Sequence, residues 1–296
     1  MAKATLFISL GSAAFQVGSA LSVAMFATVA VSTVSSLRFI TASVILLAVF
    51  RPHLRGRSRA NWLAIAGMGL SMAANGLGLL YAMDRLDLGI VLTLNFLGPC
   101  VVALVGSHRP AEVACALVAL GGVVLIAGPG GGFDLIGFIF AITAAFSMAL
   151  YTLMTEKVGK AGGLSDLSLA MAIAAVLLLP FGAPGFGDLT WSSLAAVAGI
   201  GIIGTVTPPC FDTLAGRASS ARVVGTLFSV DPALAAVAGY FMLGQTITWP
   251  IGLGMAVVTA AGALLMWSAP AAKPDGQPAG PVTDQPTGQV GGPSAD

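Results

Sequence analysis

The feature that most constrains the fold is a succession of ten apolar runs, each close to the length of a membrane-spanning helix. About 20 apolar residues cross the hydrocarbon core of a bilayer as an α-helix. Only 8% of the 296 residues are charged, against roughly 25% in soluble domains. We therefore predict an all-α integral membrane protein with ten transmembrane helices. The runs are 5–27, 32–50, 61–82, 88–106, 111–128, 135–155, 166–184, 192–212, 221–243 and 250–268.

The first run has a second interpretation. Lys3 followed by an apolar stretch also fits a secretory signal peptide. We interpret the run as the first helix, because nine further runs follow it and it is long for the apolar region of a signal peptide.

The distribution of positive charge predicts the orientation in the membrane, because Lys and Arg accumulate in short cytoplasmic loops. With the N-terminus inside, Arg85 lies outside, Arg38 lies within a span, and the other eleven cations are cytoplasmic. Both termini are therefore predicted to be cytoplasmic. The eleven are Lys3, Arg51, Arg55, Arg57, Arg59, Arg109, Lys157, Lys160, Arg217, Arg222 and Lys273.

Two halves of five spans predict an inverted repeat. Because five is odd, the second half enters the membrane from the opposite side, and Pro99 and Pro232 interrupt corresponding spans of the two halves. We expect the repeats at 1–130 and 131–268. The segment 269–296 is rich in Pro, Gly and polar residues, too poor in apolar groups to form a core, and is predicted to be a disordered cytoplasmic tail.

Several classes of function are excluded because the sequence lacks the motifs that they require. The net charge is only +1, and nothing matches a nucleic-acid-binding motif. Cys100, Cys115 and Cys210 lie in apolar runs without paired spacing, and His53 and His108 stand alone at span ends, so we predict neither a metal site nor disulfides. No catalytic motif is present. The sequence therefore predicts a protein that is not an enzyme and holds no cofactor.

Asp231 is the most informative polar residue. A charged side chain at mid-membrane costs roughly 2.5–3.5 kcal/mol, so it requires a partner, a proton or a wet cavity. Pro232 removes a helical donor and frees the carbonyl of Phe228, as Pro99 does for Asn95. Asp231 either binds substrate or a proton, or has a structural role, capping this broken backbone or pairing with a neighbouring residue, and the sequence alone leaves both open.

Arg38 and a second proline pair add two candidate features. Arg38 lies within the second span, where it either contacts a carboxylate or extends to the outer interface. Pro208 and Pro209 free the carbonyls of Gly204 and Thr205 and so weaken the eighth span. We expect a hinge or a cavity wall at that point.

Other polar residues within the spans are candidates for lining the same cavity. Each also has the simpler interpretation of an interhelical hydrogen bond. These residues are Asn95, Thr93, Asn75, Gln16, Ser12, Tyr151, Ser147 and Ser229.

Three segments resemble EamA-type members of the drug/metabolite transporter superfamily, with the threonine/homoserine exporter branch as the nearest match: residues 34–47, 85–112 and 225–248. The most specific parts are the LGP and DPALAAVAG sequences within the last two. The similarity extends over about residues 6–268. The resemblance implies an inner-membrane exporter of amino acids or related metabolites, with a cavity between two inverted five-helix halves and efflux driven by proton motive force. Arg38 matches the arginine in the second span of the family.

We therefore predict a secondary transporter that exports a small polar metabolite, an amino acid, by alternating access in the lipid bilayer. Asp231 is expected to bind the substrate ammonium or a proton, Arg38 to contact a carboxylate, and Pro99 and Pro232 to expose backbone acceptors. Two alternatives stay open: export of drugs or other metabolites on the same fold, and a non-transporting membrane scaffold. The sequence leaves the oligomeric state undetermined.

Overall fold

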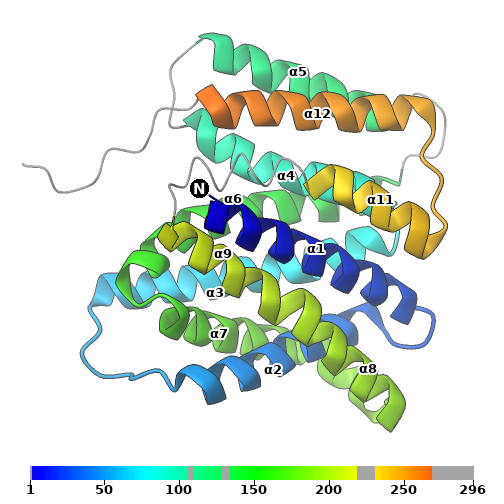
Figure 1. Ribbon diagram of the computed structural model, residues 1–296. Helices are drawn as coiled ribbons and strands as arrows, with labels where there is room; N and C mark the ends of the chain where they lie inside the picture. Colours follow the sequence, from blue (N-terminus) through cyan, green and yellow to red (C-terminus); the bar gives the residue numbers. More distant parts are fainter. Residues whose placement is uncertain (1, 106–109, 128–133, 219–230, 269–296) are drawn as a thin grey trace, which may run out of the picture.

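The structure is a computed structural model that describes residues 2–105, 110–127, 134–218 and 231–268 (Figure 1). Within these ranges all regular structure is helical, and the helices lie side by side with their long axes roughly aligned. The predicted tail at 269–296 lies outside the described residues. The all-α class is thus as predicted.

Each predicted run contains a described helix, and most ends agree within a few residues. One run is broken into three consecutive elements, α8, η2 and α9. The elements are α1 (Ala2–Met25), α2 (Val31–Phe50), α3 (Arg59–Met83), α4 (Leu88–Val105), α5 (Pro110–Ala127), α6 (Leu135–Ala161), α7 (Leu164–Gly182), η1 (Ala183–Asp188), α8 (Trp191–Gly201), η2 (Ile202–Val206), α9 (Thr207–Ala218), α11 (Asp231–Leu243) and α12 (Trp249–Ser268).

Six segments are long and apolar enough to cross a membrane, and four shorter apolar helices accompany them within the described ranges. The six are Leu6–Met25, Val31–Phe50, Arg59–Met83, Leu135–Gly159, Leu164–Asp188 and Trp191–Ala215. Ten crossings and an inverted repeat stay predictions.

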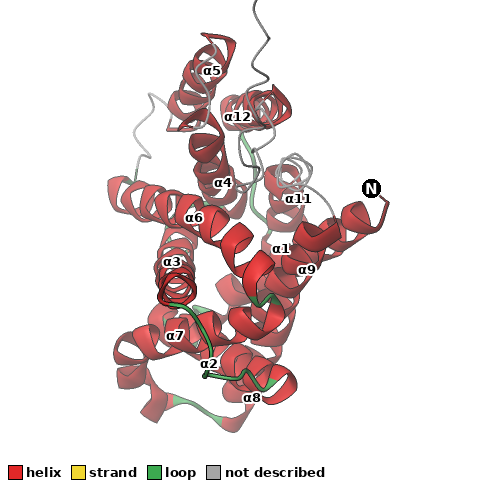
Figure 2. Ribbon diagram, turned by 90° about the vertical axis from the view of Figure 1, so that its left-hand side faces the viewer, coloured by secondary structure: helices red, strands yellow, loops and turns green. Residues whose placement is uncertain are grey.

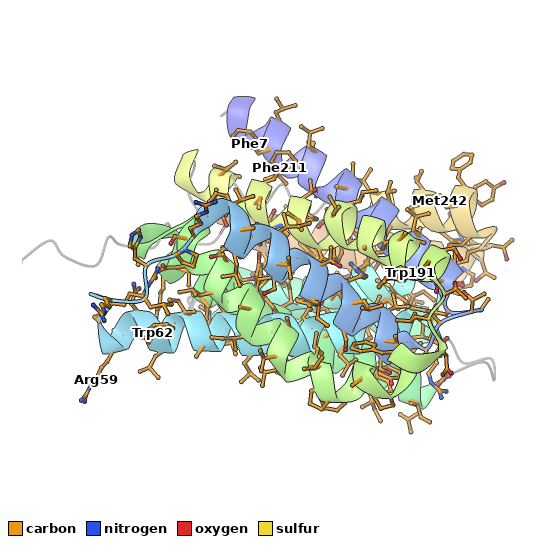
Figure 3. The ribbon with its side chains drawn as sticks, turned by 90° about the horizontal axis from the view of Figure 1, so that it is seen from below. Phe7, Arg59, Trp62, Trp191, Phe211 and Met242 are labelled. Atoms are coloured by element: carbon orange, nitrogen blue, oxygen red, sulfur yellow. The ribbon has the colours of Figure 1, made fainter. Side chains whose placement is uncertain are left out.

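The outer surface of the bundle suits contact with lipid. Large apolar side chains such as Val44, Leu63 and Phe146 are exposed, as expected where the surrounding solvent is hydrocarbon. Figure 3 shows Trp62 near one end of the bundle and Trp191 near the other. Tryptophan is enriched at both membrane interfaces, so these positions match the two edges of a bilayer.

Several of the main helix contacts recur when the two predicted halves are exchanged, although in the described ranges the contact of α4 with α12 has no comparable counterpart between α11 and α5. Helix α3 packs on α6 as α1 packs on α9, and α4 packs on α6 as α11 packs on α1. Three contacts map onto themselves: α2 with α7, α4 with α11, and α5 with α12. The last pair lies at one edge of the bundle, beside α4 (Figures 1 and 2).

Charged contacts fix the chain at the helix ends. Asp166, in the first turn of α7, is fully buried and accepts hydrogen bonds from Arg57 and from Asn61 Nδ2. Arg57 also donates to Ser165 Oγ and to the carbonyl of His53. The segment between α2 and α3 is thereby attached to the start of α7.

A more exposed pair joins the segment between α3 and α4 to the start of α6. Arg85 Nη1 lies 3.1 Å from Asp134 Oδ2, and Asp134 caps α6 by accepting from the Gly137 N–H. This backbone bond, with Arg85 contributing, lowers the pKa of the Asp134 carboxyl below its usual value. The cap therefore persists at neutral pH and is lost only as the pH falls through that lowered pKa.

The crossing of α1 over η2 depends on two glycines. A Cβ at Gly18 would overlap the backbone of Gly204, whose nitrogen would lie 2.8 Å away. A Cβ at Gly204 would lie 2.8 Å from the Gly18 Cα and 3.1 Å from Arg38 Nη2. Close backbone approach of this kind is how membrane helices pack where lipid offers no hydrophobic drive.

We expect Gly18→Ala to lower the free energy of unfolding by about 1–3 kcal/mol, the usual cost of overpacking. Neither backbone at the crossing has a flexible end that can move aside. Thermal unfolding of the purified protein in detergent measures the effect. Gly199→Ala is the matched control, because a Cβ there meets no heavy atom within 4 Å. Equal unfolding temperatures for the two variants would contradict the close crossing.

Candidate functional site

A cavity of about 130 Å³ lies at the centre of the bundle, between helices of both predicted halves. Such a volume has room for several water molecules. The wall is largely apolar, with a few polar side chains directed into it, as is usual for small-molecule sites. The polar lining residues are Ser12, Ser19, Ser35, Arg38, Asn75, Asn95, Tyr151, Thr205, Asp212 and Asp231.

Arg38 is buried in this wall, with 6% of its surface exposed. It therefore does not extend to the membrane interface, which was one of the two predicted interpretations. Its Nε donates to Thr205 Oγ1 at 3.0 Å, Nη1 to Ser22 Oγ at 2.9 Å and Nη2 to the Gly204 carbonyl at 3.2 Å. All three partners are neutral. An arginine has five N–H donors, so two remain for a further acceptor.

The broken helix supplies two of these acceptors. η2 is a single stretch of π-helix, a distortion that often occurs at functional sites. Pro208 and Pro209 cannot donate to the carbonyls of Gly204 and Thr205, and the Gly204 carbonyl accepts from Arg38 instead. Both prolines line the cavity. The predicted weak point of the eighth span thus holds the arginine in place.

Asp231, the first described residue of α11, faces the cavity, and its Oδ1 is buried without a hydrogen-bond partner. Ser12 lies close enough to interact with this carboxyl, but Ser12 Oγ also makes no hydrogen bond. Gln16 Nε2 donates to the Asp231 carbonyl at 3.3 Å, while Gln16 Oε1 is unpartnered. Unpartnered polar atoms of this kind are costly unless water or a ligand binds them.

Asp212 in α9 is a second buried carboxyl group on the cavity wall, and the sequence analysis missed it. The predicted eighth run ended at residue 212, which placed this side chain at the interface. The helix continues to Ala218 and carries the residue inward. Asp212 interacts with the Tyr151 hydroxyl and electrostatically with Asp231. Its position one turn after Pro208, on the same helix face, is the signal that would have identified it.

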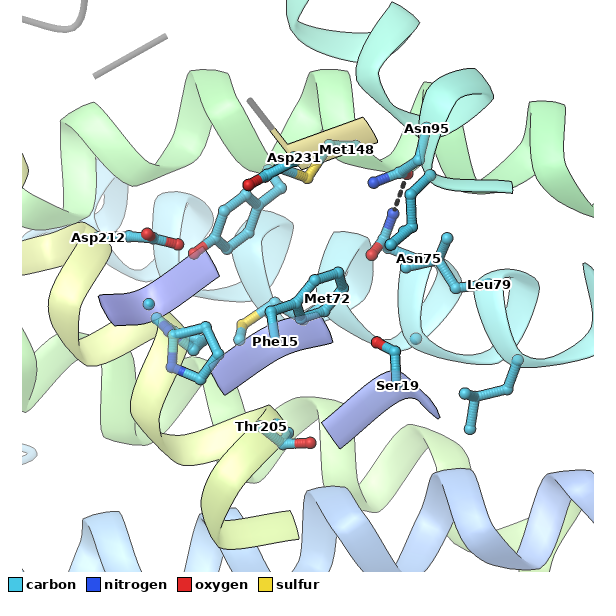
Figure 4. A pocket seen from close by; sticks show the side chains of 18 of the residues that line it. Phe15, Ser19, Met72, Asn75, Leu79, Asn95, Met148, Thr205, Asp212 and Asp231 are labelled. Carbon is cyan, nitrogen blue, oxygen red and sulfur yellow. Dashed lines mark hydrogen bonds between the residues drawn. The ribbon is translucent and has the colours of Figure 1, made fainter. Parts of the chain in front are cut away.

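Two asparagines lie at another part of the wall. Asn75 Nδ2 donates to Asn95 Oδ1 and to the Ala144 carbonyl, each at 2.8 Å. The dashed line in Figure 4 marks the bond between the two asparagines. Both residues line the cavity, together with Pro99. They therefore satisfy both predicted interpretations, as an interhelical hydrogen bond and as cavity lining.

The remaining candidates are not brought into the cavity. The Thr93 hydroxyl donates to the Gly89 carbonyl of its own helix, and the Ser147 hydroxyl donates to the Thr143 carbonyl of its own helix. Neither is among the residues that line the cavity. Pro232 is buried in α11 but also does not line it. Ser229 lies outside the described residues.

The chain is similar to known transporters. The EamA-like transporter family matches residues 135–267. The threonine/homoserine exporter RhtA of Salmonella typhimurium strain LT2 is 30% identical over 261 residues, which cover 86% of this chain and 88% of that protein. RhtA of Escherichia coli K12 is 30% identical over 246 residues, with 81% and 83% covered.

A solved crystal structure shares the fold. It aligns with a TM-score of 0.58 at 19% sequence identity, covering 88% of this chain and 96% of its own. At this identity the likeness concerns the arrangement of the helices alone.

Proposed function

Because this chain belongs to the EamA-like transporter family, close to the RhtA branch, we propose that it exports a small polar metabolite, an amino acid of the threonine or homoserine kind. The protein moves its substrate across the inner membrane by alternating access, and this export is coupled to protons. The chain crosses the membrane ten times as two inverted repeats, with both termini in the cytoplasm. The helix contacts that recur when the two halves are exchanged support the inverted repeat.

The observation that carries the proposal is the bipolar cavity. Arg38 lies in its wall with only neutral partners, and the same cavity contains the carboxyl group of Asp231. Buried charges require compensation. A substrate with one carboxylate and one ammonium compensates both, so the charge distribution favours an amino acid over a neutral solute. The unpartnered Ser12 Oγ, Ser35 Oγ and Asp231 Oδ1 offer further contacts to a polar substrate.

Proteoliposomes with an imposed pH gradient test the proposal through the efflux of radiolabelled threonine and homoserine. We expect gradient-driven efflux from the wild-type protein and a fall of about tenfold or more in Asp231→Asn, which keeps the shape but loses a charged hydrogen-bonding group. Asp84→Asn, a change at the exposed C-cap of α3, is the control. Unchanged efflux in Asp231→Asn would remove that carboxyl from the mechanism.

A second candidate is export of hydrophobic drugs on the same fold. The apolar part of the wall supports it, because Phe15, Phe39, Phe96, Met72 and Met148 all line the cavity. Growth-inhibition profiles of cells that overexpress the protein separate the two functions. Resistance to apolar compounds without resistance to amino acid excess would favour the drug exporter.

A further inference from the structure

The cavity is lined by two carboxyl groups, although the proposed function so far uses only one. Asp231 comes from α11 and Asp212 from α9. They lie close enough to interact electrostatically. Figure 4 shows both on one side of the cavity, away from Thr205, the residue that accepts from Arg38 Nε. The acidic groups and the guanidinium therefore occupy different ends of one space.

The acidic end lacks a cation of its own among the described side chains. The ion pairs of this part of the chain are Arg57 with Asp166 and Arg85 with Asp134, and neither pair lines the cavity. Three of the five donors of Arg38 bind neutral oxygens, from Thr205, Ser22 and Gly204. Two carboxyl groups that repel each other in an apolar cavity require a proton or a cation beside them.

The polar neighbours of the two carboxyls are suited to a primary ammonium. Such a group has three donors in a compact arrangement. Asp231 Oδ1 and Ser12 Oγ are buried acceptors without a hydrogen-bond partner. Asp212 adds a second carboxyl group, which also interacts with the Tyr151 hydroxyl. Tyr151 is itself buried, so it limits how far the Asp212 side chain can turn.

We infer that Asp212 and Asp231 together form the ammonium-binding end of the cavity, and that Asp212 is a specificity-determining residue for substrates with a free amino group. The inference rests on the proposed export of amino acids and adds Asp212 to it. Arg38 binds the carboxylate at the other end, and the apolar wall between them contacts the substrate side chain. A substrate that lacks the ammonium makes none of the contacts at the acidic end of the cavity.

Full-length Asp212→Asn in proteoliposomes tests the inference by counterflow exchange of two substrates. One is threonine, and the other is 2,3-dihydroxybutanoate, in which a hydroxyl replaces the ammonium. We expect threonine exchange to fall roughly 10- to 100-fold, the value of a charged hydrogen bond, while exchange of the hydroxy acid stays the same or rises. Asp212→Glu is expected to recover part of the preference for threonine.

Two further variants keep the test decisive. Asp212→Asn with Asp231→Asn should lose little more than either single variant, because residues that act as one unit are not additive. If Asp212→Asn does not fold, Tyr151→Phe removes only the hydroxyl beside Asp212, and we expect it to lower the threonine preference about 3- to 10-fold.

The outcomes separate this inference from the proposed function. A folded Asp212→Asn protein, or Tyr151→Phe in its place, with the wild-type ratio between the two substrates would overturn the role of Asp212 and leave amino acid export standing. Wild-type protein that exchanges no amino acid would overturn both.

Discussion

Arg38→Gln is expected to reduce kcat/KM for threonine export by more than about 100-fold, because the two charged hydrogen bonds that we propose between Arg38 and the substrate carboxylate are lost, at about 1.5–3 kcal/mol each. In the structure Arg38 uses three of its donors on Thr205, Ser22 and Gly204. The two that remain suit a carboxylate, which arginine binds in a bidentate manner. Initial rates in proteoliposomes over a range of threonine concentrations measure the loss.

A second substitution and a second substrate identify the role of the Arg38 guanidinium. Arg38→Lys keeps the charge but not the planar fork, so we expect an intermediate rate. 1-Amino-2-propanol, which is threonine without its carboxylate, should be transported equally by the wild-type and Arg38→Gln proteins. Arg85→Gln is the control, because Arg85 belongs to an exposed pair outside the cavity. A similar loss with both substrates would show that Arg38 only holds η2 in place.

The helices were predictable from the sequence because an apolar run of about 20 residues has few alternatives. Each predicted run contains a described helix. The break near Pro208 was also predictable, because a missing N–H leaves carbonyls free wherever the helix packs. The partner of the freed Gly204 carbonyl was not predictable, because that partner, Arg38, lies 166 residues away in the chain.

The polar residues were harder to place because helix period alone does not determine which neighbour a side chain meets. Thr93 satisfies its hydroxyl within its own helix, an option open to any threonine in a span. Asp212 was missed because an apolar run loses its signal at the first charged residue, even where the helix continues inward. Asp166 gave no local signal, since its partner Arg57 lies 109 residues away.

Asp166→Ala is expected to lower the free energy of unfolding by about 3–5 kcal/mol, the cost of removing one member of a buried ion pair. The carboxylate is fully buried and accepts from Arg57 and Asn61. Arg57, with 11% of its side chain exposed, would lose its counter-ion with little water to replace it. The same change detaches the segment between α2 and α3 from α7. Thermal unfolding in detergent, followed by circular dichroism, measures the effect.

A double variant separates the charge from the packing. Arg57→Met with Asp166→Leu removes both charges together and should recover most of the stability, because an apolar pair of similar volume often replaces a buried ion pair without loss. Arg85→Ala, which breaks only the exposed pair with Asp134, should change the unfolding temperature little, because solvent screens such a pair. If Asp166→Ala unfolds at the wild-type temperature, the segment between α2 and α3 is not held by this carboxylate. If the double variant is as unstable as the single one, the loss comes from the missing hydrogen bonds of Asp166 to Arg57 and Asn61 and not from an unpaired charge.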